Sequence, residues 1–274
     1  MTDFHTKKTS EYESDVVELF EFSLGTTTHK YTSYPGGYIH QGVEYKHHNL
    51  GRGGDRDGAN LEKMELPVYC DPDFAPIQRY FHSPPSAHMT LTLYEVERSV
   101  DEKLQRRFAT LSGFTKEEGR VTMVFEPHST SLRRTGLSQT FSPLCVNRLY
   151  EEDVLGCGVI KANFAVPATV ESFTDYSLVT NALEGVEDHV YGGGLLEYEA
   201  EDGILESRTI ISQVGTKISV SMRLYGLDAT TPITIYRGCD RLRETCEKEF
   251  KAIEFFQGHD TSPDTGPFDG QPIF

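Results

Sequence analysis

The sequence predicts a mostly β protein with two domains. Many short segments alternate between apolar and polar residues, turn-forming residues separate these segments, and only two stretches have helical periodicity. A chain of 274 residues has enough apolar material for two cores of ordinary size. We expect a flexible arm over residues 1–14, a β-barrel-like domain over 15–140, and a second β domain, closed by a short helix, over 141–274.

In the first domain, the pattern predicts a meander of strands with one helix. Residues 72–81 have apolar side chains at helical spacing and predict a short helix. Residues 61–68 and 89–96 alternate strictly and predict half-buried strands. The segment 51–60 is rich in Gly, Arg and Asp and is expected to be a loop. The other predicted strands are 16–24, 29–33, a hairpin over 38–45, 108–114 and 120–126.

The second domain continues the strand pattern and then changes to a helix. Gly192-Gly193-Gly194 predicts a turn between strands. After Cys239, Asp240 is expected to be the N-cap of a helix. Residues from 260 onwards are rich in Pro, Gly and Asp and predict no regular element. The residues at helical spacing are Leu242, Cys246, Phe250 and Ile253, and the predicted strands are 163–170, 177–181, 194–198, 209–214, 217–222 and 233–236.

The composition bounds the function. The net charge is −16, whereas proteins that bind nucleic acid directly are usually basic, because their affinity comes from neutralising phosphates. No apolar run reaches the length of a membrane span, and the N-terminus lacks the apolar segment of a secretory signal. We therefore expect folding in a cytoplasm. The odd number of cysteines, five, argues against a disulfide framework.

Two pairs of cysteines suggest a metal centre in the second domain. Cys145 and Cys157 form the first pair, and Cys239 and Cys246 the second. We expect the four thiolates to converge on one metal centre, although neither pair has the short CxxC spacing of common zinc modules. Three interpretations remain open from spacing: buried free thiols, a zinc site, or an iron–sulfur cluster, which accepts ligands that lie farther apart than zinc does. Cys70 has no partner in this pattern.

The two cysteine segments resemble a known family. Leu149-Tyr-Glu-Glu-Asp-Val-Leu-Gly-Cys157-Gly and Arg237-Gly-Cys239-Asp…Thr245-Cys246 are similar to signatures of the tail-tip hub proteins of long, non-contractile-tailed bacteriophages and gene transfer agents, a group that includes tail tip protein L of phage lambda. The similarity extends to Val17-Glu-Leu-Phe-Glu-Phe near the start. Lys251-Ala252 stands where the family has Gly-Asn.

The resemblance implies a structural virion protein and not an enzyme. It implies a homotrimeric ring between the tail tube and the central host-recognition hub protein, with the distal tail and tape measure proteins as further partners. DNA would pass through the ring without specific binding. It also implies a [4Fe–4S] cluster in the C-terminal domain, with structural zinc as the alternative. The four ligands that match the family positions are Cys145, Cys157, Cys239 and Cys246.

Two other groups of residues give weaker indications of a binding site: the glycine-rich segments and a group of histidines. Gly51-Arg-Gly-Gly54 and the Gly192–Gly194 turn lack the Gly-Lys-Ser/Thr ending of a phosphate loop. His47 and His48, with His40 nearby, suggest a metal site, but adjacent residues of a strand point to opposite faces. Surface histidines are the preferred interpretation of this group.

Two further function classes remain as alternatives. A receptor- or carbohydrate-binding tail-tip module requires exposed aromatic side chains in a groove, and glycan binding by the purified chain would reveal it. A tail-associated hydrolase requires a pair of acids such as Glu197 and Glu199, or two from Glu151-Glu152-Asp153. No tryptophan accompanies these acids, so solvated acidic loops are the preferred interpretation.

Overall fold

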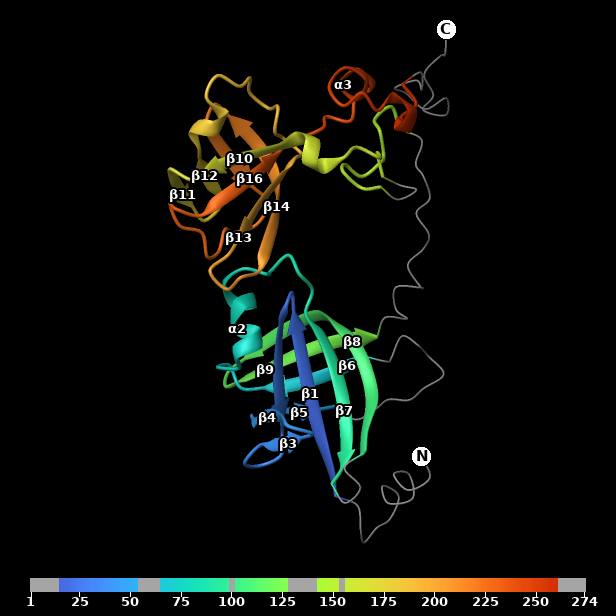
Figure 1. Ribbon diagram of the computed structural model, residues 1–274, viewed down its shortest axis with the longest axis vertical. Helices are drawn as coiled ribbons and strands as arrows, with labels where there is room; N and C mark the ends of the chain where they lie inside the picture. Colours follow the sequence, from blue (N-terminus) through green and yellow to red (C-terminus); the bar gives the residue numbers. More distant parts are fainter. Residues whose placement is uncertain (1–14, 54–64, 99–101, 128–141, 153–155, 261–274) are drawn as a thin grey trace, which may run out of the picture. The chain divides into compact units, whose positions relative to one another are not determined.

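The chain forms two compact units, Met1–Arg134 and Thr135–Phe274. The computed structural model describes residues 15–53, 65–98, 102–127, 142–152 and 156–260. The predicted arm (1–14) and the predicted irregular tail, apart from residue 260, lie outside the described residues. Each unit has its own β-sheet (Figure 1), so the predicted mostly β class is confirmed.

The first unit has a nine-stranded sheet in the order β3-β4-β2-β1-β7-β8-β9-β6-β5. Most of its strands lie where alternation of apolar residues predicts them. The largest departures are β8, which is longer than predicted, and β5, which occupies part of a predicted loop. The elements are β1 Val16–Leu24, β2 Thr27–Thr32, β3 Tyr38–His40, β4 Val43–His47, β5 Gly51–Arg52, β6 Leu66–Cys70, α2 Ala75–His82, β7 Thr90–Glu97, β8 Glu102–Glu117 and β9 Arg120–Pro127.

The segment from β4 to β5 closes this sheet into a barrel-like shape. At one end, β4 pairs in parallel with β2, and the N–H of His48 donates to the carbonyl of Thr32 over 3.0 Å. At the other end, β5 pairs with β6. The segment therefore joins β2 to β6, which are otherwise far apart in the strand order. Arg52 on β5 also forms an ion pair of 2.6 Å with Glu18 on β1.

Aromatic side chains fill the interior of the first unit. The rings of Phe22 on β1 and Phe125 on β9 lie 6.0 Å apart although two strands separate β1 from β9 in the sheet, so the contact crosses the interior. Phe74, just before α2, contacts Phe22 at 5.1 Å. Figure 1 shows α2 at one end of these strands, where Phe74 and Ile77 are fully buried.

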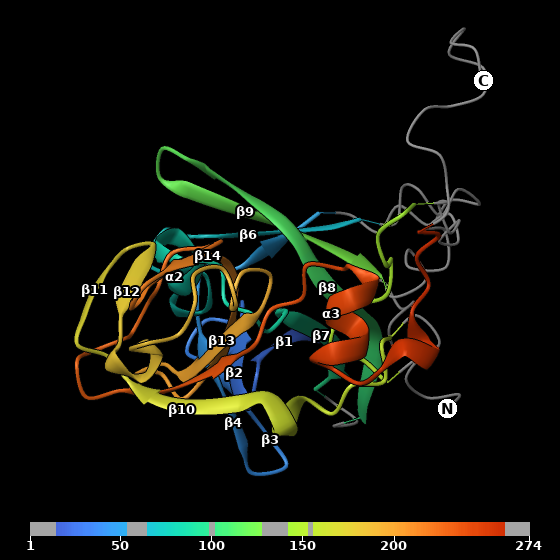
Figure 2. The ribbon, with the colours of Figure 1, turned by 90° about the horizontal axis from the view of Figure 1, so that it is seen from above.

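The hairpin of β8 and β9 is the longest feature of the first sheet. Figure 2 shows it extending well beyond its neighbours. Within β8, sequence alternation predicts only 108–114 as strand. The end of the strand, 115–117, is exposed at every position, and 102–107 contains a single apolar residue, so neither part carries an apolar period. The register shift between Leu111 and Gly113 shows a bulge in the same strand. None of the helices in the described part of the chain has the length and apolar character to cross a membrane.

The second unit has a seven-stranded sheet in the order β10-β16-β13-β14-β15-β12-β11. A bulge between Ile210 and Ser212 divides β14, so that its first half pairs with β13 and its second half with β15. The elements are η3 Lys161–Phe164, β10 Ala165–Thr169, β11 Ser172–Thr174, β12 Ser177–Val179, η4 Asn181–Leu183, β13 Leu195–Glu199, β14 Leu205–Val214, β15 Lys217–Val220, β16 Pro232–Tyr236, α3 Arg243–Lys248 and η5 Ile253–Phe255.

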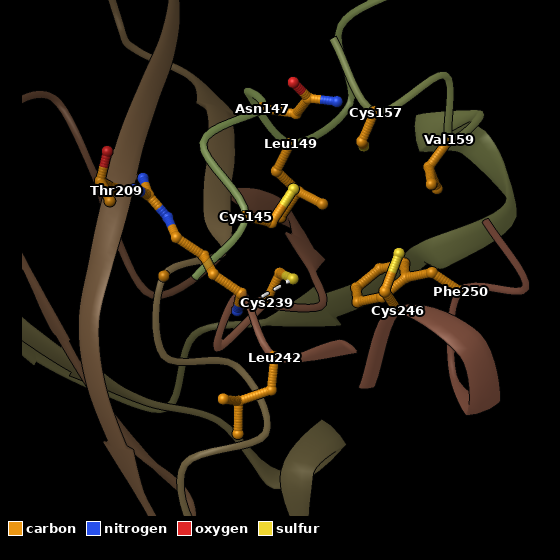
Figure 3. Close-up of a pocket in the computed structure, with 12 residues that line it drawn as sticks. Cys145, Asn147, Leu149, Cys157, Val159, Thr209, Cys239, Leu242, Cys246 and Phe250 are labelled. Carbon is orange, nitrogen blue, oxygen red and sulfur yellow. Dashed lines mark hydrogen bonds between the residues drawn. The ribbon is translucent and has the colours of Figure 1, made fainter. Parts of the chain in front are cut away.

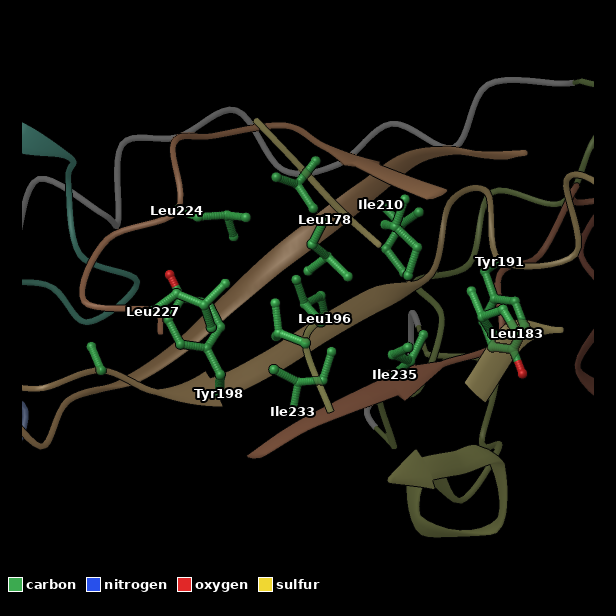
Figure 4. Close-up of a cluster of buried hydrophobic side chains, with 14 residues drawn as sticks. Leu178, Leu183, Tyr191, Leu196, Tyr198, Ile210, Leu224, Leu227, Ile233 and Ile235 are labelled. Atoms are coloured by element: carbon green, nitrogen blue, oxygen red, sulfur yellow. The ribbon is translucent and has the colours of Figure 1, made fainter. Parts of the chain in front are cut away.

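The core of the second unit lies between the inward faces of these strands. Figure 4 shows Leu196, Ile233 and Ile235 packed together, and all three are almost fully buried. Because alternate residues of a strand face the same side, the buried positions recur with a period of two along β13 and β16. This core positions the strand ends from which the loops of the candidate site emerge.

Candidate metal centre

The four cysteines that are predicted to bind a metal line one cavity of the second unit, with a volume of about 180 Å³. Figure 3 shows the four sulfur atoms around a common space, two from the segment after residue 144 and two from the segment around α3. All four are free thiols; Cys145, Cys157 and Cys246 are buried, and Cys239 is half-buried. The four cysteines that the sequence analysis assigned to one site therefore line the same cavity.

Backbone hydrogen bonds link the first cysteine pair to the second. The N–H of Cys145 donates to the carbonyl of Arg241 over 2.9 Å. The N–H of Cys157 donates to the carbonyl of Arg148 over 3.0 Å, which closes the loop between the two cysteines of the first pair. Gly156 allows this closure, because a Cβ there would lie 1.9 Å from the carbonyl oxygen of Glu151. The loop therefore requires glycine immediately before Cys157.

The predicted turn at Gly192–Gly194 holds the segment before Cys239. A Cβ on Gly238 would lie 1.9 Å from the carbonyl oxygen of Gly192, and a Cβ on Gly194 would lie 2.1 Å from that of Tyr236. Two backbones thus pass each other at a distance that only glycine permits. The turn is confirmed, and its position next to Cys239 gives it a role that the sequence does not reveal.

The helix after Cys239 is shorter than predicted, and its N-cap is not Asp240. The helix α3 begins after Leu242, which occupies the N-cap position without a side-chain hydrogen bond. The Asp240 carboxylate instead accepts hydrogen bonds from the N–H of Leu242 (2.9 Å) and the hydroxyl of Thr245 (2.8 Å). Asp side chains form such local turns readily, and Arg241 at φ 65° interrupts the helical backbone. The predicted helical positions Phe250 and Ile253 lie beyond α3.

Two backbone N–H groups donate hydrogen bonds to sulfur atoms of the candidate ligands. Tyr150 donates to Sγ of Cys157 and Arg241 donates to Sγ of Cys239, each over 3.3 Å. Both donors have a left-handed backbone, at φ 66° and 65°. This conformation is costly for residues other than glycine and persists where the surroundings enforce it. Such donors stabilise a thiolate relative to a thiol, which favours metal binding.

Burial and repulsion from neighbouring thiols raise the pKa values of Cys239 and Cys246 and so oppose their ionisation in the absence of a metal. Burial, together with the neighbouring Cys145, Cys239 and Cys157, raises the pKa of Cys246 to about 11. Burial also raises the pKa of Cys239, an effect that the N–H of Arg241 partly offsets. As a neutral thiol, Cys246 donates to the carbonyl of Ala252 over 3.3 Å. Binding a metal ion here would require the thiols to release protons.

The metal-free protein should lose stability at alkaline pH. The Cys246 thiol has a pKa of about 11 in the folded state against 9.0 for the ordinary thiol, so between these values the folded chain binds more protons than the unfolded chain. The free energy of unfolding contributed by Cys246 is complete below pH 9 and falls as the pH rises toward 11. Urea unfolding of metal-free protein at several pH values should show this fall, and Cys246→Ala should have a shallower slope. Equal slopes would contradict the assigned shift.

Tyr150 joins the two cysteine segments through its side chain. Its hydroxyl donates to the carbonyl of Arg237 over 2.6 Å, and its ring contacts Phe250 at 6.4 Å. Burial raises the pKa of Tyr150, and the nearby Cys157 and Cys239 raise it further. The hydroxyl is therefore a neutral donor at physiological pH.

Removing this hydroxyl should weaken the second unit and leave the capacity of the four thiols to bind a metal unchanged. Tyr150→Phe keeps the ring and deletes one buried hydrogen bond, which should lower the free energy of unfolding by about 1 kcal/mol. Denaturant unfolding measures this loss, and the metal content per chain should equal that of the wild type. A large loss of metal would show instead that the hydroxyl acts on the ligands.

The site includes residues that the sequence analysis did not single out. Asn147 is buried and its amide donates to the carbonyl of Phe255 over 2.7 Å, which ties the first cysteine segment to η5. A single asparagine two residues after Cys145 belongs to no recognisable motif, so the sequence alone does not indicate this contact. Cys70, by contrast, belongs to the first unit, where burial raises the pKa of its thiol to about 12. It is an inert core thiol, separate from the four.

The spacing of the thiols bears on the metal. Across the described part of the chain, the one group of three or more ligand atoms within 4.8 Å of one another is that of His48, Asp71 and Asp73. No three of the four described thiols therefore lie that close together. A single zinc ion brings its thiolates to about 3.8 Å from one another, because each Zn–S bond is about 2.3 Å long.

The chain is similar to proteins of phages and of a gene transfer agent. Residues 189–265, which contain Cys239 and Cys246, match the family described as "phage conserved hypothetical protein BR0599". No curated protein matches the chain. A chain in the solved structure titled "Virion of native gene transfer agent (GTA) particle" has a TM-score of 0.78 and 16% sequence identity, and the match covers 100% of both chains. The whole chain thus shares the fold of a protein from a gene transfer agent particle.

Proposed function

We propose that this chain is a structural protein of the virion, located at the tail tip of a long non-contractile-tailed phage or gene transfer agent. In this role it forms a homotrimeric ring that joins the tail tube to the central host-recognition hub protein and lines the DNA channel. The distal tail and tape measure proteins are its other neighbours. The observation that carries the proposal is the end-to-end similarity in fold to a chain of a gene transfer agent virion. The match of residues 189–265 to a phage family supports it independently.

The four cysteines fit a structural [4Fe–4S] cluster. Such clusters are held by four Cys thiolates, and Cys145, Cys157, Cys239 and Cys246 face one cavity. A cubane has an iron at each of four corners, so it holds its thiolates farther apart than a single zinc ion does. No three of the described thiols lie within 4.8 Å of one another, and this arrangement, together with the cavity of about 180 Å³, favours the cluster over zinc. When bound, the group links two segments that are far apart in sequence.

The remaining site residues support a structural role. Tyr150 and Arg241 orient two of the sulfur atoms, and the glycines around Cys239 fix the approach of the second segment. The net charge of −16 suits a wall past which DNA moves, because a negative surface repels phosphates. These features require no substrate.

Immunogold labelling of intact particles tests the proposed location. Antibodies against the purified chain should label the distal end of the tail and leave the capsid unlabelled. The same particles, treated with antibodies against a capsid protein, provide the control. Labelling on the capsid, or protein found only in host cells and never in particles, would contradict the proposal. Mass photometry of the purified chain should show a trimer as the assembled species.

A further inference from the structure

We propose a second metal site in the first unit, formed by His48, Asp71 and Asp73, which binds a divalent transition-metal ion such as Mn²⁺ or Zn²⁺. One ring nitrogen of His48 and one carboxylate oxygen of each aspartate all lie within 4.8 Å of one another. One imidazole and two carboxylates form a donor set that these ions accept. The site is independent of the four cysteines, which belong to the other unit.

The imidazole of His48 has bonding capacity that the described residues do not use. Its Nε2 atom is buried and has no hydrogen-bond partner among them. A buried polar atom without a partner is costly, and a bound ion or its water would remove that cost. The ring is held in place by Phe74 at 4.7 Å and Tyr31 at 5.8 Å between ring centroids. The side chain is therefore oriented before any ion binds.

The carboxylates are also held in position. The amide of Asn49 donates to both oxygens of Asp71, over 3.1 and 3.2 Å. The carbonyl of Asp71 accepts the N–H of Phe74 over 3.1 Å, which forms the turn that carries Asp73. Outer contacts of this kind orient metal ligands and keep them within reach of one ion. Asp73 is exposed, which leaves a path for the ion from solvent.

The three residues lie on two segments of the first unit that a bound ion would link. His48 lies on the segment between β4 and β5 that closes the barrel-like sheet. Asp71 and Asp73 lie between β6 and α2. An ion held by all three would fasten the closing segment to the start of the helix. His47, although adjacent, is exposed and bonds through Nδ1 with the carbonyl of Tyr34 over 3.0 Å, so it takes no part.

Titration of the purified full-length protein with Mn²⁺ tests the proposal. Mn²⁺ prefers oxygen and nitrogen donors to thiolates, so the cysteine cavity does not compete for it. The signal of free Mn²⁺ in electron paramagnetic resonance should disappear until one ion is bound per chain. Loss of an outer partner of a metal ligand typically weakens metal affinity ~10–100-fold. Because His48→Ala and Asp73→Asn each alter a direct ligand, each should weaken Mn²⁺ binding by at least that much.

Matched controls separate this site from others. His47→Ala should bind Mn²⁺ like the wild type, and so should Cys246→Ala. The apparent melting temperature of the first unit should rise with Mn²⁺ in the wild type and stay constant in Asp73→Asn, whose exposed position makes a folding defect from the substitution itself small. Unchanged binding in both His48→Ala and Asp73→Asn, or loss of binding in Cys246→Ala, would overturn the proposal.

Discussion

Cys246→Ala should remove the proposed metal centre and loosen the second unit while leaving the first unit folded. Cys246 is buried in a small cluster with Cys157, Val159 and Phe250, and most of this cluster surrounds the cavity. A structural metal site can contribute on the order of 10 kcal/mol to folding, so its loss should exceed the effect of any ordinary core substitution. Hydrogen exchange should rise across residues 142–260 and stay unchanged in 15–53.

Cys70→Ala provides the matched control for this result. It also removes a buried thiol, but in the first unit and away from the cavity. This variant should keep the metal content and the exchange pattern of the second unit. If Cys246→Ala retained full metal content, or if both variants affected the second unit equally, the four-thiol centre would be wrong.

Gly238→Ala should be the next most damaging change. The new Cβ would lie 1.9 Å from the carbonyl oxygen of Gly192, which belongs to a backbone that cannot simply rotate away. The two loops must separate, and Cys239, the next residue, must move with them. We expect a loss of about 4 kcal/mol or more in the free energy of unfolding, together with reduced metal content.

Gly113→Ala is the appropriate comparison, because no atom lies within 4 Å of a Cβ added there. Denaturant unfolding should place this variant within about 1 kcal/mol of the wild type, with unchanged metal content. A Gly238→Ala protein as stable and as metal-rich as the wild type would show that the close approach of the loops is unimportant for the site.

The strand pattern could be predicted from sequence because burial imposes a period of two. In β1 and β13, fully buried positions alternate with partly buried ones along most of the strand. The two ends of β8, 102–107 and 115–117, could not be predicted in this way, because their only apolar residue is Leu104 and no residue in them is fully buried. The short strand β11 is exposed at every position and sits at a sheet edge, so it also has no apolar period.

The cysteine pairs could be grouped from sequence, but the details of the site could not. The helical spacing of Leu242, Cys246 and Phe250 predicts a helix that starts at Asp240, whereas local hydrogen bonding by the Asp240 carboxylate delays its start. Tyr150 combines a left-handed backbone with an N–H bond to Sγ of Cys157, and no spacing rule encodes either feature. Likewise, His48 lies near Asp71 and Asp73 because the segment from β4 to β5 closes the barrel-like sheet. From the sequence alone, the neighbours considered for His48 are His47 and His40.

Analysis of iron and acid-labile sulfide in anaerobically purified wild-type protein tests the central claim most directly. The account predicts a brown protein that absorbs near 400 nm, with about four iron and four sulfide per chain, in keeping with a [4Fe–4S] cluster on four cysteines. A colourless protein that contains about one zinc and no sulfide would contradict it.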